Sequence, residues 1–543
     1  MRSLLLLSLL LTACASSPPP AAPSTAQIWT DLRVITGDPE HPEFSGLRHD
    51  GGLITHLWSG EVPAGLDGAR RSFDGAAAVP GLVDAHLHLR GIGRADRQIK
   101  LQGTASIAEV AARVSAATDR APGTWIRGRG WDQNDWADTA FPTASPLDAA
   151  APEHPVWLTR VDGHAVWVNA RAMALAGVDA QTADPPGGQI LRGADGAPTG
   201  VFVDNAIDLL AAALPAPTDA EVRADLERGV RLCQEAGLVG VHDMGVGAQA
   251  MAQLQAMEGA PLGLRVWAYH GGGDDLAERL AGGPDREGRL QVPGVKLFAD
   301  GALGSRGAAL LAPYSDRPES SGLLLTEPDA LTATVRLAHG LGFQVAIHAI
   351  GDRGNRVALD ALGALGPNDR RHRIEHAQIV DPADIARFAA LGVTASMQPT
   401  HATSDMPWVP DRLGPDRLEG AYAWRRFLEA GVPLAFGSDA PVESHDPRLG
   451  LYAAVTRQDA AGSPEGGWLP DQVLSIEEAL AAFSAGPAAA VGSAGGVLRV
   501  GAPADLTVLD RDPRAAAPKE LLDLVVLRTV VGGESVYVRG EGG

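Results

Sequence analysis

The sequence has little positive charge, few aromatic residues and few cysteines. Among its 543 residues, 45 are Lys or Arg and 66 are Asp or Glu, so the formal net charge is −21. This excess of acid argues against a nucleic-acid partner, because neutralising phosphates requires a basic surface. Aromatic residues make up 5%, but the hydrophobic share of 45% and the charged share of 20% are close to globular values and argue against disorder.

Of the two cysteines, Cys14 lies in an N-terminal targeting pattern. Arg2 precedes an apolar run over residues 4–11 that is too short to span a bilayer, and Leu-Thr-Ala-Cys at 11–14 resembles a bacterial lipobox. We therefore predict a lipoprotein signal peptide at residues 1–13, lipidation of Cys14 and a lipid-anchored linker at residues 14–25. The alternative is an ordinary signal peptide with an incidental cysteine.

The predicted anchor sets the expected location. Ala15 follows Cys14 where an inner-membrane retention signal would place Asp, so we expect an exported protein at the periplasmic face of the outer membrane. No later apolar run reaches about 18 residues, so membrane contact is expected only through the lipid. Cys233 is then left without a disulfide partner. The sequence is compatible with a homodimer but does not specify one.

Four segments share one pattern: an amphipathic helix, a glycine that ends it, a short apolar strand and a polar residue at the strand's end. The four polar residues are His242, His348, Gln398 and Asp439. Residues 81–88, 264–270, 295–301 and 373–378 are four further strands that end in polar residues. Alternating helices and strands indicate a parallel sheet, so we predict an α/β fold, a (β/α)8 TIM barrel whose strand C-termini share one functional face.

The domain limits follow from this assignment. The barrel is expected at residues 80–489, with an insertion at about 105–220 after the first strand, because that stretch is too long for a simple crossover. Residues 26–79 and 490–543 hold short β-like runs, and neither end is long enough for a core of its own. We expect the two ends to combine into one small β-sandwich.

The strongest local signal is Asp84-Ala85-His86-Leu87-His88. Two histidines two residues apart on a strand point to the same side, so both imidazoles can reach one ion. His348, His376 and Asp439 each end another predicted barrel strand. A core histidine bonded to a carbonyl is the alternative for each one alone, but convergence on one face favours a metal site.

Lys296 is the remaining candidate ligand. The chain has three lysines, Lys100, Lys296 and Lys519, and otherwise uses arginine. Lys296 lies in the apolar strand VKLF, where an unpaired ammonium is costly, and a buried lysine with a lowered pKa can react with carbon dioxide to form a metal-bridging carbamate. The alternative is a buried lysine paired with Asp300 or Asp439.

These segments together resemble a known family. The motifs VPGLVDAHLH, VKLFADGALGSR, VAIHAIGDR, RIEHAQ and GSDAPVE are similar to those of the metal-dependent amidohydrolase superfamily, and most closely to its YtcJ-like and N-substituted formamide deformylase-like branch. The resemblance covers almost all of the chain that remains after removal of the predicted signal peptide. It implies two divalent ions, expected to be zinc, bridged by an N6-carboxylated Lys296. The implied ligands are His86, His88 and Asp439 for one ion and His348 and His376 for the other.

The resemblance also implies a reaction. Two ions that share a hydroxide lower its pKa, and one polarises the scissile carbonyl. Asp439 would move the proton to the leaving amine, and His164 would bond the oxyanion. We expect hydrolysis of a C–N bond in a small amide, N-formyl or N-acyl compound. The alternatives are a cyclic amide, lactone or ester hydrolase on the same site, or an inactive binding lipoprotein.

The substrate contacts are expected in the insertion and in the loop after Lys296. Trp131, Asp132 and Asp162 combine aromatic and polar groups near the expected mouth of the barrel. The tryptophan has an alternative role in packing the insertion. Arg306 is expected to clamp an anionic group of the substrate or to pair with Asp300.

Overall fold

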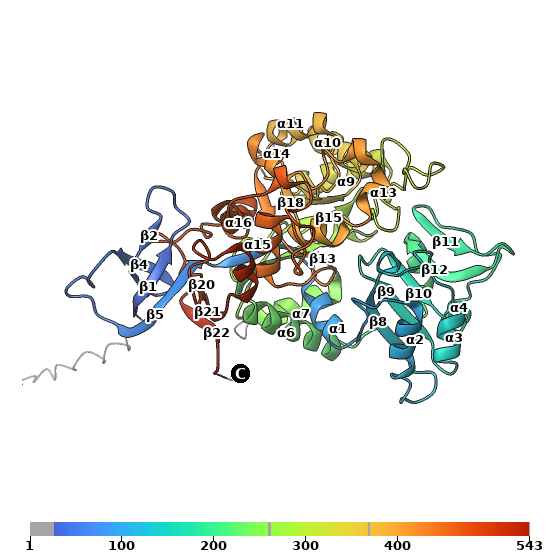
Figure 1. The fold of residues 1–543 in the computed structure, drawn as a ribbon, viewed down its shortest axis with the longest axis horizontal. Helices are drawn as coiled ribbons and strands as arrows, with labels where there is room; N and C mark the ends of the chain where they lie inside the picture. The colour runs from blue at the N-terminus through green and yellow to red at the C-terminus, as the bar shows by residue number, and fades with distance from the viewer. Residues whose placement is uncertain (1–25, 259–261, 367–369, 542–543) are drawn as a thin grey trace, which may run out of the picture.

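The computed structural model describes residues 26–258, 262–366 and 370–541. The predicted signal peptide, Cys14 and the linker lie outside these residues. Three hydrogen-bonded sheets are present in the described chain, and the barrel lies between the other two (Figure 1). The predicted TIM barrel is confirmed, since its eight parallel strands are those expected from the sequence. In sheet order they are β19 (Leu434–Phe436), β18 (Thr394–Met397), β17 (Arg373–His376), β16 (Gln344–Ala349), β15 (Leu290–Phe298), β14 (Arg265–His270), β13 (Leu238–Val246) and β6 (Leu82–Leu87).

Helices follow the strands and cover the barrel. They are α1 (Leu89–Asp96), α6 (Asp219–Glu235), α7 (Ala248–Glu258), α8 (Leu276–Arg279), α9 (Pro328–Gly340), α10 (Asp352–Gly363), α11 (Pro382–Leu391), α12 (Pro399–Asp405), α13 (Val409–Leu413), α14 (Trp424–Glu429), α15 (Pro447–Thr456), α16 (Ile476–Ala482) and α17 (Ala485–Val491). Sequence signals set their ends. Thr218 and Glu221 form a capping box at the start of α6, and Gly392 ends α11 with a left-handed φ of 62°.

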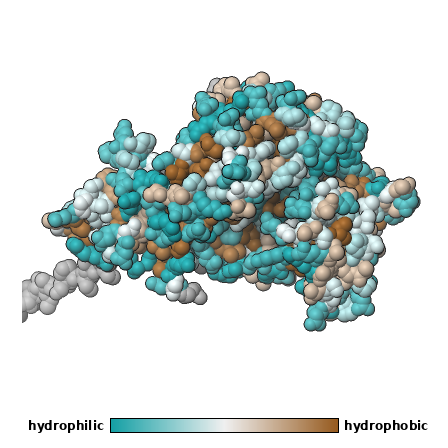
Figure 2. Space-filling view, viewed as in Figure 1, coloured by the Kyte–Doolittle hydropathy of each residue, from teal (hydrophilic) through white to brown (hydrophobic). Residues whose placement is uncertain are grey.

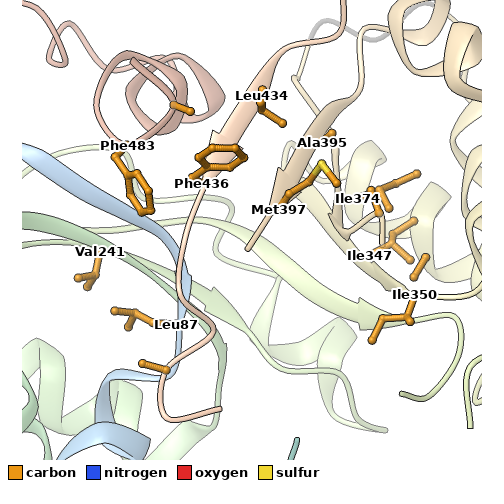
Figure 3. Close-up of a cluster of buried hydrophobic side chains, with 14 of the residues drawn as sticks. Leu87, Val241, Ile347, Ile350, Ile374, Ala395, Met397, Leu434, Phe436 and Phe483 are labelled. Carbon is orange, nitrogen blue, oxygen red and sulfur yellow. The ribbon is translucent and has the colours of Figure 1, made fainter. Parts of the chain in front are cut away.

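The barrel strands alternate apolar and polar residues. Leu87, Val241, Ile347 and Ile374 belong to the apolar cluster between strands and helices (Figure 3). Because successive side chains of a strand point to opposite sides, their neighbours His86, His242, His348 and Glu375 point into the barrel. The interior of the barrel is therefore polar and buried.

The first and last strands meet through the loop that follows β19. Asp439 N–H donates to the carbonyl of His86 (2.6 Å), and His88 N–H donates to the carbonyl of Ala440 (2.8 Å). Asp84 accepts from the backbone N–H groups of both His86 and Ser438. The strand that carries the histidine pair is thus fixed against the loop that carries Asp439.

Both chain ends share one eight-stranded sheet, which appears beside the barrel with blue and dark red strands adjacent (Figure 1). Its strands are β1 (Gln27–Ile35), β2 (Glu43–Phe44), β3 (Gly46–Asp50), β4 (Leu53–Trp58), β5 (Ala69–Pro80), β20 (Leu506–Leu509), β21 (Val526–Val531) and β22 (Glu534–Val538). The ends join where β5 pairs antiparallel with β20, from Pro80 opposite Leu506 to Ala77 opposite Leu509. Trp29, Leu47 and Val530 contribute to the core of this sheet.

The insertion is built on a six-stranded sheet on the other side of the barrel (Figure 1). Its elements are β7 (Ile99–Lys100), α2 (Ile107–Ser115), β8 (Ile126–Trp131), α3 (Ser145–Ala150), β9 (Val156–Arg160), β10 (Ala165–Val168), α4 (Ala170–Ala176), β11 (Gly188–Arg192), β12 (Pro198–Asp204) and α5 (Asp208–Ala211). The sheet thus begins at Ile99, ahead of the expected start near residue 105. The helix that begins at Asp219 packs against α1 and leads into β13 of the barrel.

The view in Figure 2 shows a mostly hydrophilic face with smaller hydrophobic areas. Within the described residues, no helix has both the length and the apolar character needed to cross a membrane.

Candidate metal centre and active site

The predicted ligands from the first, fourth and last strands meet at Asp439. His88 Nε2 lies 3.1 Å and His86 Nε2 3.4 Å from Asp439 Oδ1. Lys296 Nζ lies 3.3 Å from His86 Nε2. Four of the six predicted ligands therefore meet within a few ångströms at the C-terminal ends of the barrel strands.

The two remaining histidines adjoin this group. The ring of His376 lies 4.8 Å from that of His86 and 4.6 Å from that of His348, between centroids. The nearest ligand atoms of His86, His376 and Asp439 all lie within 4.8 Å of one another, and all three residues are buried. The structure thus brings together every residue that the sequence proposed as a ligand.

The orientation of the imidazoles is suited to metal binding. In three of the histidines Nδ1 is taken by a protein acceptor, which leaves Nε2 directed at the centre. The acceptors are Glu375 Oε2 for His86 (2.6 Å), the Met244 carbonyl for His88 (2.8 Å) and Gln398 Oε1 for His376 (2.8 Å). In His348 the two nitrogens exchange roles. Nε2 lies 3.4 Å from the Gly301 carbonyl, so Nδ1 is the nitrogen that remains for a metal. Metal-binding histidines are typically held through the second nitrogen in this way, so the residues present fit a metal centre.

Lys296 is buried inside the barrel. It is 1% exposed, and among the described residues no carboxylate forms an ion pair with Nζ, Asp300 and Asp439 included. Asp300 instead accepts backbone N–H groups of Ile350, Gly351 and Ala309. Burial lowers the pKa of Lys296 to about 8, so the amine is far easier to deprotonate than an ordinary lysine.

Glu375 is the main residue of the centre that sequence reasoning missed. Its carboxylate is fully buried and receives two bonds from Arg373, at 2.6 and 2.9 Å, besides that of His86. Burial alone would raise the pKa of Glu375, but Arg373 and His86 outweigh burial and hold this pKa below its usual range. The one signal in the sequence was the charged alternation Arg373-Ile374-Glu375-His376 within a barrel strand.

A cavity of about 120 Å³ opens beside the centre. It is lined by the insertion, the loop after β15, α12 and the segment after Asp439. Besides the predicted ligands His348, His376 and Asp439, three other predicted residues line it, namely Asp132, Asp162 and His164. His164 donates from Nδ1 to Asp204 Oδ1 (2.6 Å), and its ring lies 5.2 Å from that of His348. Burial alone would lower the pKa of His164, but the hydrogen bond and the negative charge of Asp204 outweigh burial and raise this pKa.

Arg160 organises the two predicted acidic residues of this cavity. The guanidinium is buried, donates to Asp162 Oδ2 (2.5 Å) and to Gln133 Oε1 (2.9 Å), and also binds Asp132. Asp132 and Asp162 are therefore held on either side of one arginine, and both belong to the wall of the cavity.

Two predicted substrate contacts do not line the cavity. Trp131 is fully buried in the insertion, where its indole donates to the Leu158 carbonyl and its ring packs near Trp167. It takes the packing role because it points into the core of the six-stranded insertion sheet. Arg306 binds Asp316 (2.8 Å), which also binds Arg412, so its guanidinium is held in the loop away from the cavity.

The segment after β18 supplies cavity residues that the sequence analysis did not name. His401 is 8% exposed, its ring stacks on His376, and Nε2 lies 3.8 Å from Asp439 Oδ2. Asp405, at the end of α12, lines the same cavity, and so does Glu443, which follows Asp439 after β19. The available signal was the row of polar residues that follows the end of a barrel strand in QPTHATSD.

A (β/α)8 barrel with histidines, a lysine and an aspartate at the C-terminal ends of its strands defines the class, a metal-dependent barrel hydrolase. The family described as "Amidohydrolase family" matches residues 73–537, and the chain belongs to this family.

Comparisons with individual proteins point to the same class of hydrolase. The Bacillus subtilis (strain 168) protein named "Putative amidohydrolase YtcJ" is 34% identical over 480 residues, which cover 86% of this chain and 90% of the relative. The N-substituted formamide deformylase of Arthrobacter pascens is 30% identical over 494 residues, 86% and 89% of the two chains. The crystal structure of an uncharacterized metal-dependent hydrolase from Pyrococcus horikoshii OT3 superposes with a TM-score of 0.75 at 29% identity, covering 91% of this chain and 99% of that one.

Proposed function

We propose that this amidohydrolase hydrolyses a C–N bond in a small amide, N-formyl or N-acyl compound with two divalent ions, zinc by preference. The observation that carries the proposal is the set of imidazoles whose second nitrogens are each tied to the protein, which leaves one nitrogen per ring for a metal. Hydrolysis of a formamide by the Arthrobacter pascens relative, as its name states, supports this choice of bond.

His86, His88 and Asp439 would hold one ion, and His348 and His376 the other. Such ions lower the pKa of a water molecule and polarise a carbonyl. Lys296 would bridge them after its neutral amine adds to carbon dioxide, forming an N–C bond and releasing one proton to give a carbamate. The lowered pKa of Lys296 and its lack of an ion pair among the described residues favour this modification.

Asp439 and His164 would move charge during the reaction. Asp439 would take the proton of the attacking water and return it to the leaving amine. Its carboxylate stays ionised for this role, because the surrounding histidines outweigh burial and keep its pKa well below the usual value. His164, fixed by Asp204, would donate a hydrogen bond to the oxygen on which negative charge develops. The products are an acid and an amine.

Metal content tests the proposal. Wild type, Lys296→Ala and the control Lys519→Ala, which removes an exposed lysine, are grown with zinc and bicarbonate and purified for elemental analysis. We expect about two ions in the wild type and the control, fewer in Lys296→Ala, and amine release from a panel of formamides and N-acyl amines only by the loaded proteins. Equal content in all three would make Lys296 structural. A metal-free wild type inactive on every amide, cyclic amide and ester would favour the binding lipoprotein.

A further inference from the structure

The active-site cavity carries more negative charge than its own lining neutralises. Besides Asp439, its lining contains five carboxylates: Asp132, Asp135, Asp162, Asp405 and Glu443. Arg160 is the one arginine or lysine among the described residues of that lining, and it is already bound by Asp132, Asp162 and Gln133. Asp405 and Glu443 are left without an ion pair among the described residues.

Asp405 and Glu443 converge on one hydroxyl. Ser404 Oγ lies 2.7 Å from Glu443 Oε1 and 3.4 Å from Asp405 Oδ1. A hydroxyl has a single proton, so Ser404 can donate to only one of the two carboxylates. The other oxygen of Asp405, Oδ2, is satisfied by Tyr422 (2.6 Å) and Gln378 (3.0 Å). Ser404 therefore serves only one of the two carboxylates at a time, and both carboxylates line the cavity.

The charges of the site are consistent with a missing cation. Burial, together with the nearby Glu443 and Asp132, raises the pKa of Asp405 to about 7. Burial also raises the pKa of Glu443, with Asp439 and Asp132 adding to the effect. Burial is the larger cause of both shifts, and a positive group placed between Asp405 and Glu443 would offset both the burial and the repulsion between the carboxylates.

A second, independent feature lies in the wall of the same cavity. His401 is 8% exposed, and its Nε2 is buried without a hydrogen-bond partner among the described residues. It lines the cavity one helical turn before Asp405, and Trp408 adds an aromatic wall. An orphaned buried nitrogen in a cavity wall is costly unless a ligand bonds to it.

We propose that the cavity selects substrates that carry a cationic group, an ammonium or a guanidinium, bound between the carboxylates of Asp405 and Glu443. This inference rests on the proposed amide hydrolysis and names its substrate class. The cation supplies several N–H donors where Ser404 supplies one, so both carboxylates are satisfied together. The scissile amide then lies toward Asp439 and His164, which line the same cavity.

Binding is tested with two ligands of equal shape that differ in charge. Butylguanidinium and butylurea are titrated calorimetrically into the metal-loaded full chain, as wild type, Glu443→Gln, Asp405→Asn and the control Glu465→Gln, whose carboxylate is exposed. We expect the cation to bind wild type about tenfold more tightly or better, the ratio to fall toward one in Glu443→Gln, and the control to keep it. Asp405→Asn is a second and less specific variant, because it also disturbs the hydrogen bonds that Asp405 accepts from Tyr422 and Gln378.

Equal affinity of the two ligands for wild type, no binding of either, or an equal change in Glu443→Gln and Glu465→Gln would overturn the inference. Hydrolysis of N-(4-aminobutyl)formamide and N-pentylformamide separates the two proposals. Equal kcat/KM for both amides refutes the cationic preference and leaves amide hydrolysis standing. Tight binding of the cation with no hydrolysis of either amide refutes the proposed reaction and leaves the cation site standing.

Discussion

Replacing Glu375 by Gln tests how far the metal centre depends on the residues behind its ligands. The carboxylate accepts bonds from Arg373 Nε (2.6 Å), Arg373 Nη2 (2.9 Å) and His86 Nδ1 (2.6 Å), and all three side chains are fully buried. Gln keeps the shape but offers one acceptor atom, and its amide N–H groups would face other donors. The buried guanidinium of Arg373 would then lose its counter-charge.

We expect Glu375→Gln to reduce both the metal affinity and the stability of the metal-free protein. Loss of a carboxylate that orients a metal-bound histidine lowers metal affinity by about 10- to 100-fold, which is about 1.4 to 2.7 kcal/mol. Breaking a buried ion pair by removing one partner destabilises the metal-free protein by about 3–5 kcal/mol. Because Arg373 still donates to the Ala85 carbonyl and to Ser396, we expect the smaller value in that range.

The assay is a chelator competition at neutral pH, with bound metal read by elemental analysis and metal-free stability read by denaturant unfolding. Glu477→Gln, which makes the same change at an exposed position, is the control. A folded Glu375→Gln protein that holds metal as tightly as wild type would refute the reasoning, because His86 would then need no carboxylate behind it.

Two further predictions concern other parts of the chain. Burial lowers the pKa of His49 to about 4, so the unfolded chain takes up a proton below pH 6.5 that the folded chain refuses. Stability is therefore lost as the pH falls from 6.5 toward 4, by up to roughly 3 kcal/mol for a shift of this size. Denaturant unfolding at both ends of this range should show a weaker pH dependence in His49→Gln but not in His56→Gln, an exposed position; equal slopes in all three proteins would refute it. Cys14→Ser should move the protein from the membrane to the soluble fraction of an expressing cell, and a membrane-bound variant would contradict the predicted lipid anchor.

The barrel could be predicted because its signals are local. A helix, a glycine such as Gly392 and an apolar strand lie next to one another in the sequence, and the polar residue at each strand's end marks the functional face. The start of the insertion was harder to predict from the sequence. The first strand of its sheet, β7, comprises only Ile99 and Lys100, and a strand of two residues shows no periodicity.

The contacts within the site could not be read in the same way. Glu375 binds His86 across 289 positions of sequence, and only the fold shows that the two share the barrel interior. Trp131 and Arg306 were assigned by residue type near the expected mouth. The direction of a side chain is decided by partners such as Leu158 and Asp316, which no local pattern specifies.

The seam between the first and last barrel strands is also the place where the proposed ligands of one ion meet. The bonds that close the barrel, from Ser438 to Asp84 across 354 positions and from Asp439 to the His86 carbonyl, also bring His86 and Asp439 together. A nascent chain that lacks its last barrel strand holds the histidine pair without the aspartate. The ion site proposed for His86, His88 and Asp439 would therefore be complete only in a chain whose barrel is closed.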